Sequence, residues 1–328
     1  MRTNENESWE RSAVQMHKNH RIASCLLGVI LAFSAGTFAY AQDAEGPVGE
    51  IQDSFEEQGM IFAPVGEPED TSSIFSSSPV ESIVWNPDWE YASFSEIHTG
   101  AATLYRASSP NGITVCVNAG HGTAGGSGAQ TLCHPDGTPK VTGGSTAAGA
   151  TYATAVSEGT TMLDGTSEAY VNLKLAQITK EKLLAAGYHV LMIRDTEDVQ
   201  LDNIARTVIA NQYADCHLAL HYDSTDYNKG FFYIGVPDVA SYRSMEPVAS
   251  YWQEHISLGE SILAGMRNAG CAVYGSGTME IDLTQTSYST IPSVDLECGD
   301  RASDYSDAAQ EMLANGILDG LNQFFDLR

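Results

Sequence analysis

Short apolar runs alternate with longer amphipathic stretches along the C-terminal two thirds of the chain. The runs have the length and β-branched composition of buried strands, and the longer stretches repeat apolar residues at helical spacing. Strands are predicted at residues 113–117, 188–193, 214–220, 230–236 and 293–296. Helices are predicted at residues 167–187, 201–212, 247–269 and 304–325. This alternation predicts an α/β fold, a single domain whose central, mostly parallel sheet is flanked by helices.

Two segments interrupt this pattern. Residues 123–166 are dominated by Gly, Ala, Ser and Thr, and loops of this length are usually functional. We expect this insertion to frame a cleft. Residues 42–108 are rich in Glu, Asp, Ser and Pro, with Arg106 as their only Lys or Arg, which predicts an acidic, weakly ordered spacer before a domain at 109–328. Trp85 and Trp89 are the exception, and we expect them to pack on that domain rather than contact a sugar.

The N-terminus has the order of a secretory signal. Lys18 and Arg21 precede an apolar run at residues 22–38, and Ala39-Tyr40-Ala41 supplies small residues for cleavage. We therefore expect residues 1–41 to be a signal peptide and the protein to be secreted or wall-associated. The alternative is an uncleaved anchor, although the run is short for a bilayer span, and only an anchor would place the chain at a membrane.

The charge and the cysteines exclude some functions. The formal net charge is -26, which argues against nucleic acid and anionic lipid as partners. Five cysteines follow residue 41, and none forms a C-x-x-C pair, so a cysteine zinc site is not expected. They are interpreted as buried thiols or as one to two bridges.

Three candidate metal ligands lie at the ends of predicted elements. His121 follows the strand at 113–117, Glu168 opens a helix, and His221 follows the strand at 214–220. Two imidazoles and one carboxylate leave a fourth position open, which is typical of catalytic zinc. Taken singly, each has a structural alternative, such as a turn residue or a favourable acid at a helix N-terminus.

Two further side chains were weighed as ligands. Glu158 lies in the insertion and is an alternative to Glu168. His217 lies four residues before His221, but in a strand that separation spans about 13 Å, so the two cannot bind one ion.

The order of motifs resembles the zinc-dependent N-acetylmuramoyl-L-alanine amidases of the amidase 3 type. The resemblance covers residues 113–325, through pieces at 115–122, 168–173, 187–194, 206–215, 220–223 and 291–297. It implies that His121, Glu168 and His221 bind Zn²⁺, that Glu297 is the catalytic carboxylate, and that peptidoglycan is the substrate. The domain would then be catalytic and would hydrolyse the amide between N-acetylmuramic acid and L-alanine.

Glu297 also suits this role physically, because a carboxylate at a strand end can accept a proton from water and pass it to a leaving amine. Asn172 and Arg206 are predicted only as supporting residues. The long insertion, Asp223 after the second histidine and residues 298–300 depart from the family pattern and put substrate detail in doubt. Two alternatives stay open: a zinc amidohydrolase acting on another amide, and a non-catalytic wall-binding protein on the same scaffold.

Overall fold

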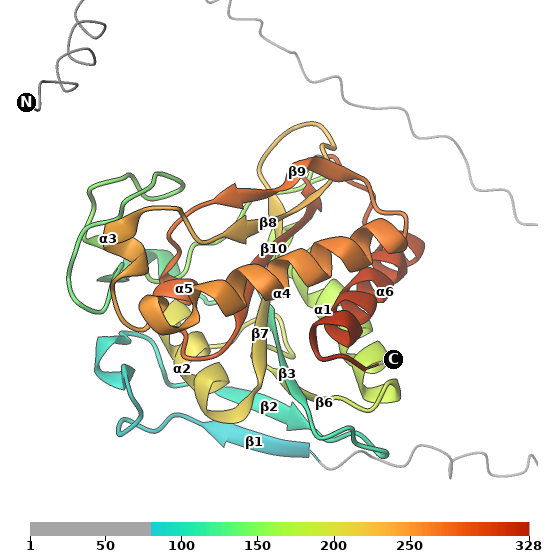
Figure 1. Cartoon of the computed structure of the whole chain (residues 1–328), viewed down its shortest axis with the longest axis horizontal. Coiled ribbons are helices and arrows are strands. Elements are labelled where there is room, and N and C mark those ends of the chain that lie inside the picture. The colour runs from blue at the N-terminus through green and yellow to red at the C-terminus, as the bar shows by residue number, and fades with distance from the viewer. Residues whose placement is uncertain (1–79, 328) are drawn as a thin grey trace, which may run out of the picture. The chain divides into compact units, whose positions relative to one another are not determined.

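An eight-stranded sheet forms the centre of residues 80–327, the part of the chain that the computed structural model describes (Figure 1). Its strand order is β1-β2-β6-β3-β7-β10-β8-β9. The strands are β1 (Val80–Val84), β2 (Ala101–Tyr105), β3 (Thr114–Ala119), β6 (His189–Met192), β7 (Cys216–Asp223), β8 (Phe231–Gly235), β9 (Val273–Glu280) and β10 (Ser293–Asp300). The pairs β6–β3, β3–β7, β7–β10 and β8–β9 are parallel. The pairs β1–β2, β2–β6 and β10–β8 are antiparallel. The predicted, mostly parallel sheet is confirmed.

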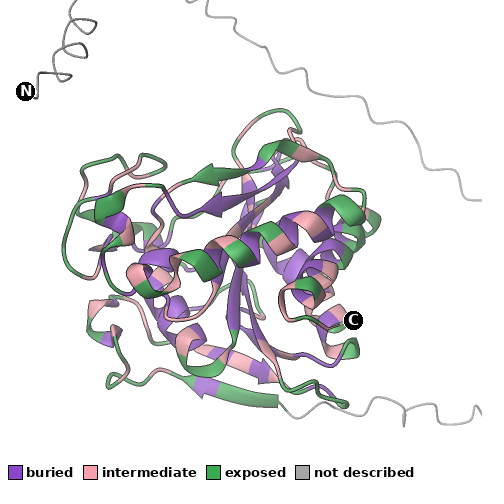
Figure 2. Cartoon of the chain, in the orientation of Figure 1, coloured by how far each residue is buried: buried purple, intermediate pink, exposed green. Residues whose placement is uncertain are grey.

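Helices cover both faces of this sheet, as predicted (Figure 1). One face carries α1 (Glu168–Ala185), α4 (Val248–Asn268) and α6 (Asp307–Phe324), and the other carries α2 (Asn203–Tyr213) and the short α5 (Thr284–Tyr288). A further short helix, α3 (Ala240–Arg243), precedes α4. Ser167 caps α1, because its side chain accepts the N–H of Tyr170. Figure 2 shows α4 buried toward the sheet and exposed on its outer side.

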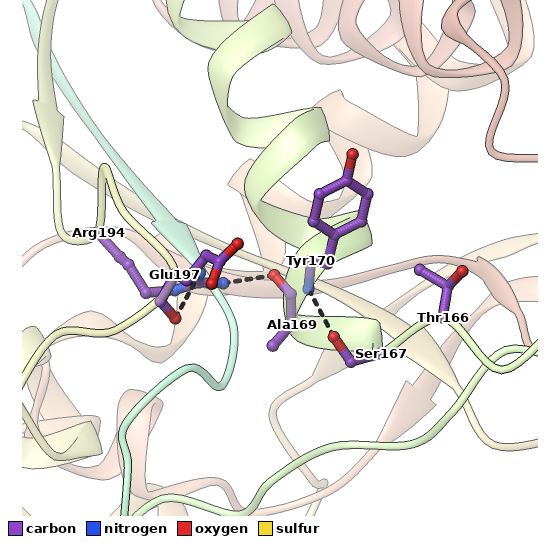
Figure 3. Close-up of a pocket in the computed structure, with 6 residues that line it drawn as sticks. All are labelled: Thr166, Ser167, Ala169, Tyr170, Arg194 and Glu197. Atoms are coloured by element: carbon purple, nitrogen blue, oxygen red, sulfur yellow. Dashed lines mark hydrogen bonds between the residues drawn. The ribbon is translucent and has the colours of Figure 1, made fainter.

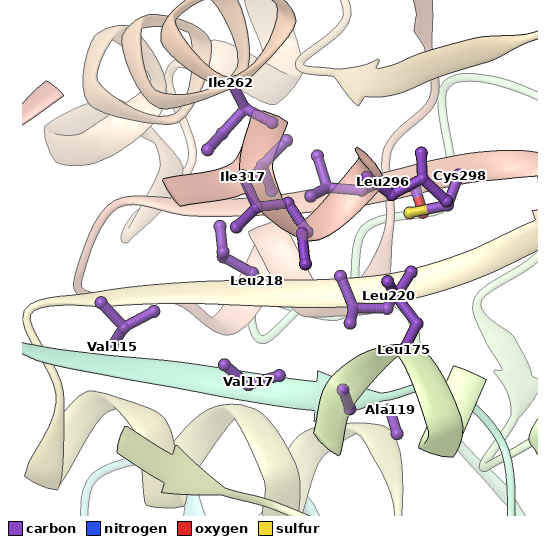
Figure 4. Packing of buried hydrophobic residues seen from close by; sticks show 14 of the residues in the cluster. Val115, Val117, Ala119, Leu175, Leu218, Leu220, Ile262, Leu296, Cys298 and Ile317 are labelled. Carbon is purple, nitrogen blue, oxygen red and sulfur yellow. The ribbon is translucent and has the colours of Figure 1, made fainter. Parts of the chain in front are cut away.

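Apolar and polar residues alternate along the central strands, so the two kinds of side chain lie on opposite faces of the sheet. Leu218, Leu220 and Leu296 are fully buried in the largest apolar cluster, under α1, α4 and α6 (Figure 4). Successive residues of a strand point to opposite faces, so the residues between them face the α2 side. His221 of β7 and Glu297 of β10 are partners in the parallel register. The sheet therefore brings these two side chains together on the face opposite the main core.

Residues 80–105 show that the spacer prediction was wrong for this part of the acidic segment. β1 and β2 pair with each other, and β2 pairs with β6, at one edge of the sheet. Ile83, Ala102 and Leu104 are buried there. The overall acidity of residues 42–108 obscured the alternation in β2, where Ala102 and Leu104 are buried between partly exposed neighbours. Residues 42–79 lie outside the described part of the chain.

The two tryptophans pack on the domain, as predicted. Trp85 belongs to the apolar cluster beneath α2, and Trp89 meets the ring of Tyr213 edge-on, with 5.9 Å between ring centroids. The same segment is held to α2 by the buried carboxylate of Asp202, which accepts the N–H of Ile97 at 2.9 Å.

A second buried carboxylate anchors the insertion at residues 123–166, which includes the hairpin β4 (Gln130–Leu132) and β5 (Tyr152–Thr154). Asp282 lies after β9 and is 1 % exposed. It lies 3.1 Å from His134 Nε2 and 3.0 Å from Lys140 Nζ, and it accepts the N–H of Val141 at 2.6 Å. Burial acts to raise the pKa of Asp282, but these hydrogen bonds outweigh it and lower that pKa well below its usual range. The insertion is thus fixed to the domain near its middle.

Three further observations concern export and the thiols. The predicted signal peptide lies outside the described residues. Within residues 80–327, no helix is long and apolar enough to cross a membrane.

All five cysteines of this range are free, so the interpretation as thiols without bridges holds for the described structure.

Candidate active site

Three side chains that are distant in the sequence bring one ligand atom each to a common point. His121 Nε2 lies 2.9 Å from Glu168 Oε1, and His221 Nδ1 lies 3.0 Å from the former and 3.1 Å from the latter. Within the described part of the chain, this is the one His, Cys, Asp and Glu cluster whose geometry suits a metal ion. Ligands at about 2.0–2.1 Å from a tetrahedral zinc ion stand about 3.3 Å from one another. The three atoms therefore fit zinc after a small expansion.

A glycine and a left-handed turn bring the two imidazoles together. The backbone of His121 has φ 63°, a conformation that costs a non-glycine residue about 1–2 kcal/mol. Gly120 precedes it, and a Cβ at this position would lie 2.2 Å from Cε1 of His221. The two rings meet edge-on with their centroids 4.6 Å apart. Only glycine at 120 lets both histidines reach the same point.

Two buried arginines hold this turn in place. Arg206 of α2 donates from Nη2 to the carbonyl of His121 at 2.7 Å. Arg194, just after β6, donates from Nη2 to the carbonyls of Gly120 at 3.1 Å and Ala169 at 2.7 Å. Burial lowers the pKa of Arg206 to about 9, which leaves the guanidinium charged at neutral pH. Arg206 thus supports the backbone of His121, and Arg194, which the sequence did not single out, links that backbone to the residue after Glu168.

Glu168 is held through both of its carboxylate oxygens. Oε2 accepts the N–H of Thr160 at 2.8 Å, and Oε1 accepts the N–H of Tyr222 at 3.1 Å and Nδ2 of Asn172 at 3.3 Å. Burial acts to raise the pKa of Glu168, but hydrogen bonds and charges from the two imidazoles lower it well below its usual range. The carboxylate is therefore ionised, as a metal ligand must be. Asn172 contacts this ligand directly.

The end of the insertion positions His121. Its Nδ1 lies 2.9 Å from the carbonyl oxygen of Ser157, a partner to which it can donate its hydrogen when Nε2 gives its lone pair to a metal ion. Gly159 has φ 83°, and a Cβ there would lie 2.7 Å from Cδ2 of His121 and 2.8 Å from Oε2 of Glu168. These contacts were not predicted from the sequence. Its one signal was a glycine directly after Glu158, inside a segment unusually long for a connection.

The profile of the Amidase_3 family, described as N-acetylmuramoyl-L-alanine amidase, matches residues 115–323, a range that contains all of these ligand candidates. The chain belongs to this family.

Two solved amidase structures share its fold. Ami1 from Mycobacterium smegmatis aligns with a TM-score of 0.54 at 17% identity, over 66% of this chain and 98% of its own. The apo form of Ami1 from Mycobacterium abscessus aligns with a TM-score of 0.53 at 17% identity, over 65% of this chain and 99% of its own. No curated protein matches the sequence. The chain is thus an N-acetylmuramoyl-L-alanine amidase by family, and its fold is that of amidase structures.

In this amidase, two carboxyl groups of β10 lie on the same strand face beside His221. Glu297 Oε2 is buried and has no hydrogen-bond partner among the described residues. Burial raises the pKa of Glu297 well above its usual range, and the charge of Asp295 adds to the shift. Asp295 was not predicted, although its position two residues before Glu297 places both on one face of the strand. Its Oδ2 lies 3.7 Å from Nε2 of His221.

The other two ligand candidates do not reach this site. Glu158 is exposed, and its Oε1 accepts a hydrogen bond from Ser127 at 3.2 Å. His217 is fully buried, with Nε2 3.2 Å from Nδ2 of Asn118. Burial lowers the pKa of His217 to about 3, so this imidazole is neutral. Of the alternatives weighed, only Glu168 joins the two histidines.

An open pocket of about 550 Å³ lies beside the N-terminus of α1, but the three ligand candidates do not line it (Figure 3). Arg194 lies in its wall, and each nitrogen of that guanidinium donates to backbone carbonyls. No cationic donor remains free to bind an anion there. The pocket is lined by Thr166, Ser167, Ala169, Tyr170, Arg194 and Glu197.

Proposed function

We propose that this amidase is a zinc-dependent hydrolase of the amide bond between N-acetylmuramic acid and L-alanine in bacterial peptidoglycan. Family membership supports the reaction. Zinc dependence is carried by one observation, the three ligand atoms that lie 2.9–3.1 Å from one another. Two imidazoles and a carboxylate with a fourth position open are typical of catalytic zinc.

A zinc ion held by His121, Glu168 and His221 supplies Lewis acidity, which polarises an amide carbonyl and makes a water molecule more acidic. The surrounding residues prepare the ligands. The carbonyl oxygen of Ser157 accepts a hydrogen bond from His121 when the ring hydrogen is on Nδ1. The backbone N–H of Thr160 donates to Oε2 of Glu168, the oxygen that faces away from the histidines. These contacts fix the ligand atoms before any ion binds, so little reorganisation is needed.

Glu297 is the group we assign to proton transfer. Its Oε2 has no partner within the described structure, and it neighbours His221 in the strand register. General acid–base catalysis works best when the pKa of the group lies near the working pH, and burial raises the pKa of Glu297 in that direction. The carboxylate can accept a proton from the attacking water and then give it to the leaving amide nitrogen.

We also propose that the protein acts outside the cytoplasm, because residues 18–41 have the order of a secretory signal and peptidoglycan lies outside the membrane. Amino-terminal sequencing of the protein recovered from the growth medium or the wall should begin at Gln42. An intact N-terminus held in the membrane fraction would show an anchor instead.

The activity test digests purified peptidoglycan with the full chain and follows the products by mass spectrometry. We expect stem peptides that begin with a free L-alanine amine, together with intact glycan strands. Chelation of the metal should abolish their release, and added zinc should restore it, because all three ligand candidates point at one site.

Other products would assign another reaction. New reducing ends would indicate a glycosidase, and peptides cut between stem residues would indicate a peptidase. Zinc-loaded protein that binds peptidoglycan and releases nothing would favour a binding role.

A further inference from the structure

The two ligand histidines differ in what holds the ring nitrogen that faces away from the ligand set. His121 points Nδ1 at the backbone carbonyl of Ser157, 2.9 Å away. His221 points Nδ1 toward the ligand set and has Nε2 on its outer side. Among the described residues, the acidic group within ion-pair distance of that Nε2 is Asp295, whose Oδ2 lies 3.7 Å from it.

Asp295 is placed for a role that acts through His221. The β10 and β7 strands run parallel, with Asp295 opposite Ala219, and this small side chain leaves the carboxylate room toward His221. Oδ1 of Asp295 is buried and has no hydrogen-bond partner within residues 80–327. The side chain is 14% exposed. A buried carboxylate oxygen without a partner is costly, so no hydrogen bond from the protein accounts for this acid here.

We propose that Asp295 is a positioning residue that orients His221 and holds the hydrogen of that imidazole on Nε2. Ligating histidines usually donate their second N–H to a carboxylate, a carbonyl or a water, which fixes the tautomer and makes the ligand more basic. With the hydrogen on Nε2, the Nδ1 lone pair points at the ligand set beside Glu168. The inference rests on the proposed zinc dependence.

A second metal ion is the main alternative for this pair of carboxylates. Asp295, Glu297 and His221 do not form a cluster of metal-binding geometry, whereas His121, Glu168 and His221 do. The geometry therefore favours one metal site supported by Asp295 over a site with two ions.

The test measures zinc affinity directly, by competition with a chromogenic chelator, for wild type, Asp295→Asn and Asp295→Ala in the full chain. Loss of such an outer partner weakens metal binding by about 10- to 100-fold, and we expect this for Asp295→Ala. Asp295→Asn should lose less, because its amide oxygen can accept a hydrogen bond from Nε2 when the imidazole moves toward it. Glu254→Gln is the control, since it removes one exposed acid of α4 that belongs to neither the ligand set nor its supports, and its affinity should equal that of wild type.

Thermal unfolding separates this role from a structural one. Without metal, Asp295→Ala should still unfold in one cooperative transition, while its gain in Tm on adding zinc should be smaller than that of wild type. Wild type that binds no zinc would overturn the proposed function itself. Wild type that binds zinc beside an Asp295→Ala protein of equal affinity would overturn this inference alone. An Asp295→Asn protein of unchanged zinc affinity that is inactive at saturating zinc would also overturn it, because Asp295 would then act on the substrate.

Discussion

Replacing Glu297 with Gln should lower peptidoglycan hydrolysis by about 10²- to 10⁴-fold, the usual contribution of general acid–base catalysis. The amide is nearly the same size as the carboxyl group but cannot accept the proton of water. Glu297 supplies none of the three ligand atoms, so zinc affinity should stay at the wild-type value. The measurement is the rate of release of alanine-terminated peptides at saturating zinc, beside the zinc affinity of the same preparation.

The same substitution should stabilise the metal-free protein. Because burial raises the pKa of Glu297 in the folded state, the folded chain binds its proton more tightly than the unfolded chain does. Ionisation therefore costs wild-type stability as the pH rises above about 4, the ordinary pKa of glutamate. Glu297→Gln does not incur this cost, so its advantage in Tm should grow from pH 4 toward neutrality.

An active Glu297→Gln protein would contradict the assignment. Asp295 would then be the group to test for proton transfer, because it is the second carboxyl group on that strand face. A variant that is inactive only because zinc is lost would show instead that Glu297 helps to hold the ligands.

The parts of this fold that were predictable are those dictated by local pattern. Apolar runs predicted the central strands, and apolar residues at helical spacing predicted α1 within residues 167–187. β9 was missed because most of its residues are exposed and it contains Gly275 and Gly277, which weaken a strand pattern. α5 was missed because five residues are too few to show helical periodicity.

The site divides in the same way. Motif order predicted His121, Glu168, His221 and Glu297 as site residues, since each lies near the end of a predicted element, and the structure brings the first three together. The role of Asp295 depends on the register between β10 and β7, which pairs Glu297 with His221 and is set by tertiary structure. Local sequence patterns predict single strands but not which residues of two distant strands lie opposite each other. The contacts of residues 157–160 with His121 and Glu168 likewise depend on how the insertion packs against the domain.

Replacing Gly159 with Ala should disrupt the metal site through the insertion rather than through a ligand. The new Cβ would lie 2.7 Å from Cδ2 of His121 and 2.8 Å from Oε2 of Glu168, closer than such atoms approach. One of the two ligands must move, or the segment that holds Ser157 and Thr160 must withdraw from both. We expect zinc affinity to fall by about 10- to 100-fold, the loss typical when the residues that hold a metal ligand are disturbed.

Gly165→Ala is the control that isolates this contact. Gly165 belongs to the same insertion and has φ 93°, close to the φ of 83° at Gly159, but a Cβ there would meet no atom within 4 Å. Both substitutions force a side chain into the left-handed region, at about 1–2 kcal/mol, so their Tm losses from backbone strain should be similar. Only Gly159→Ala should also lose zinc affinity and activity. Equal zinc affinity in the two variants would show that residues 157–160 merely cover the site, whereas a loss confined to Gly159→Ala would make the insertion part of the metal-binding structure.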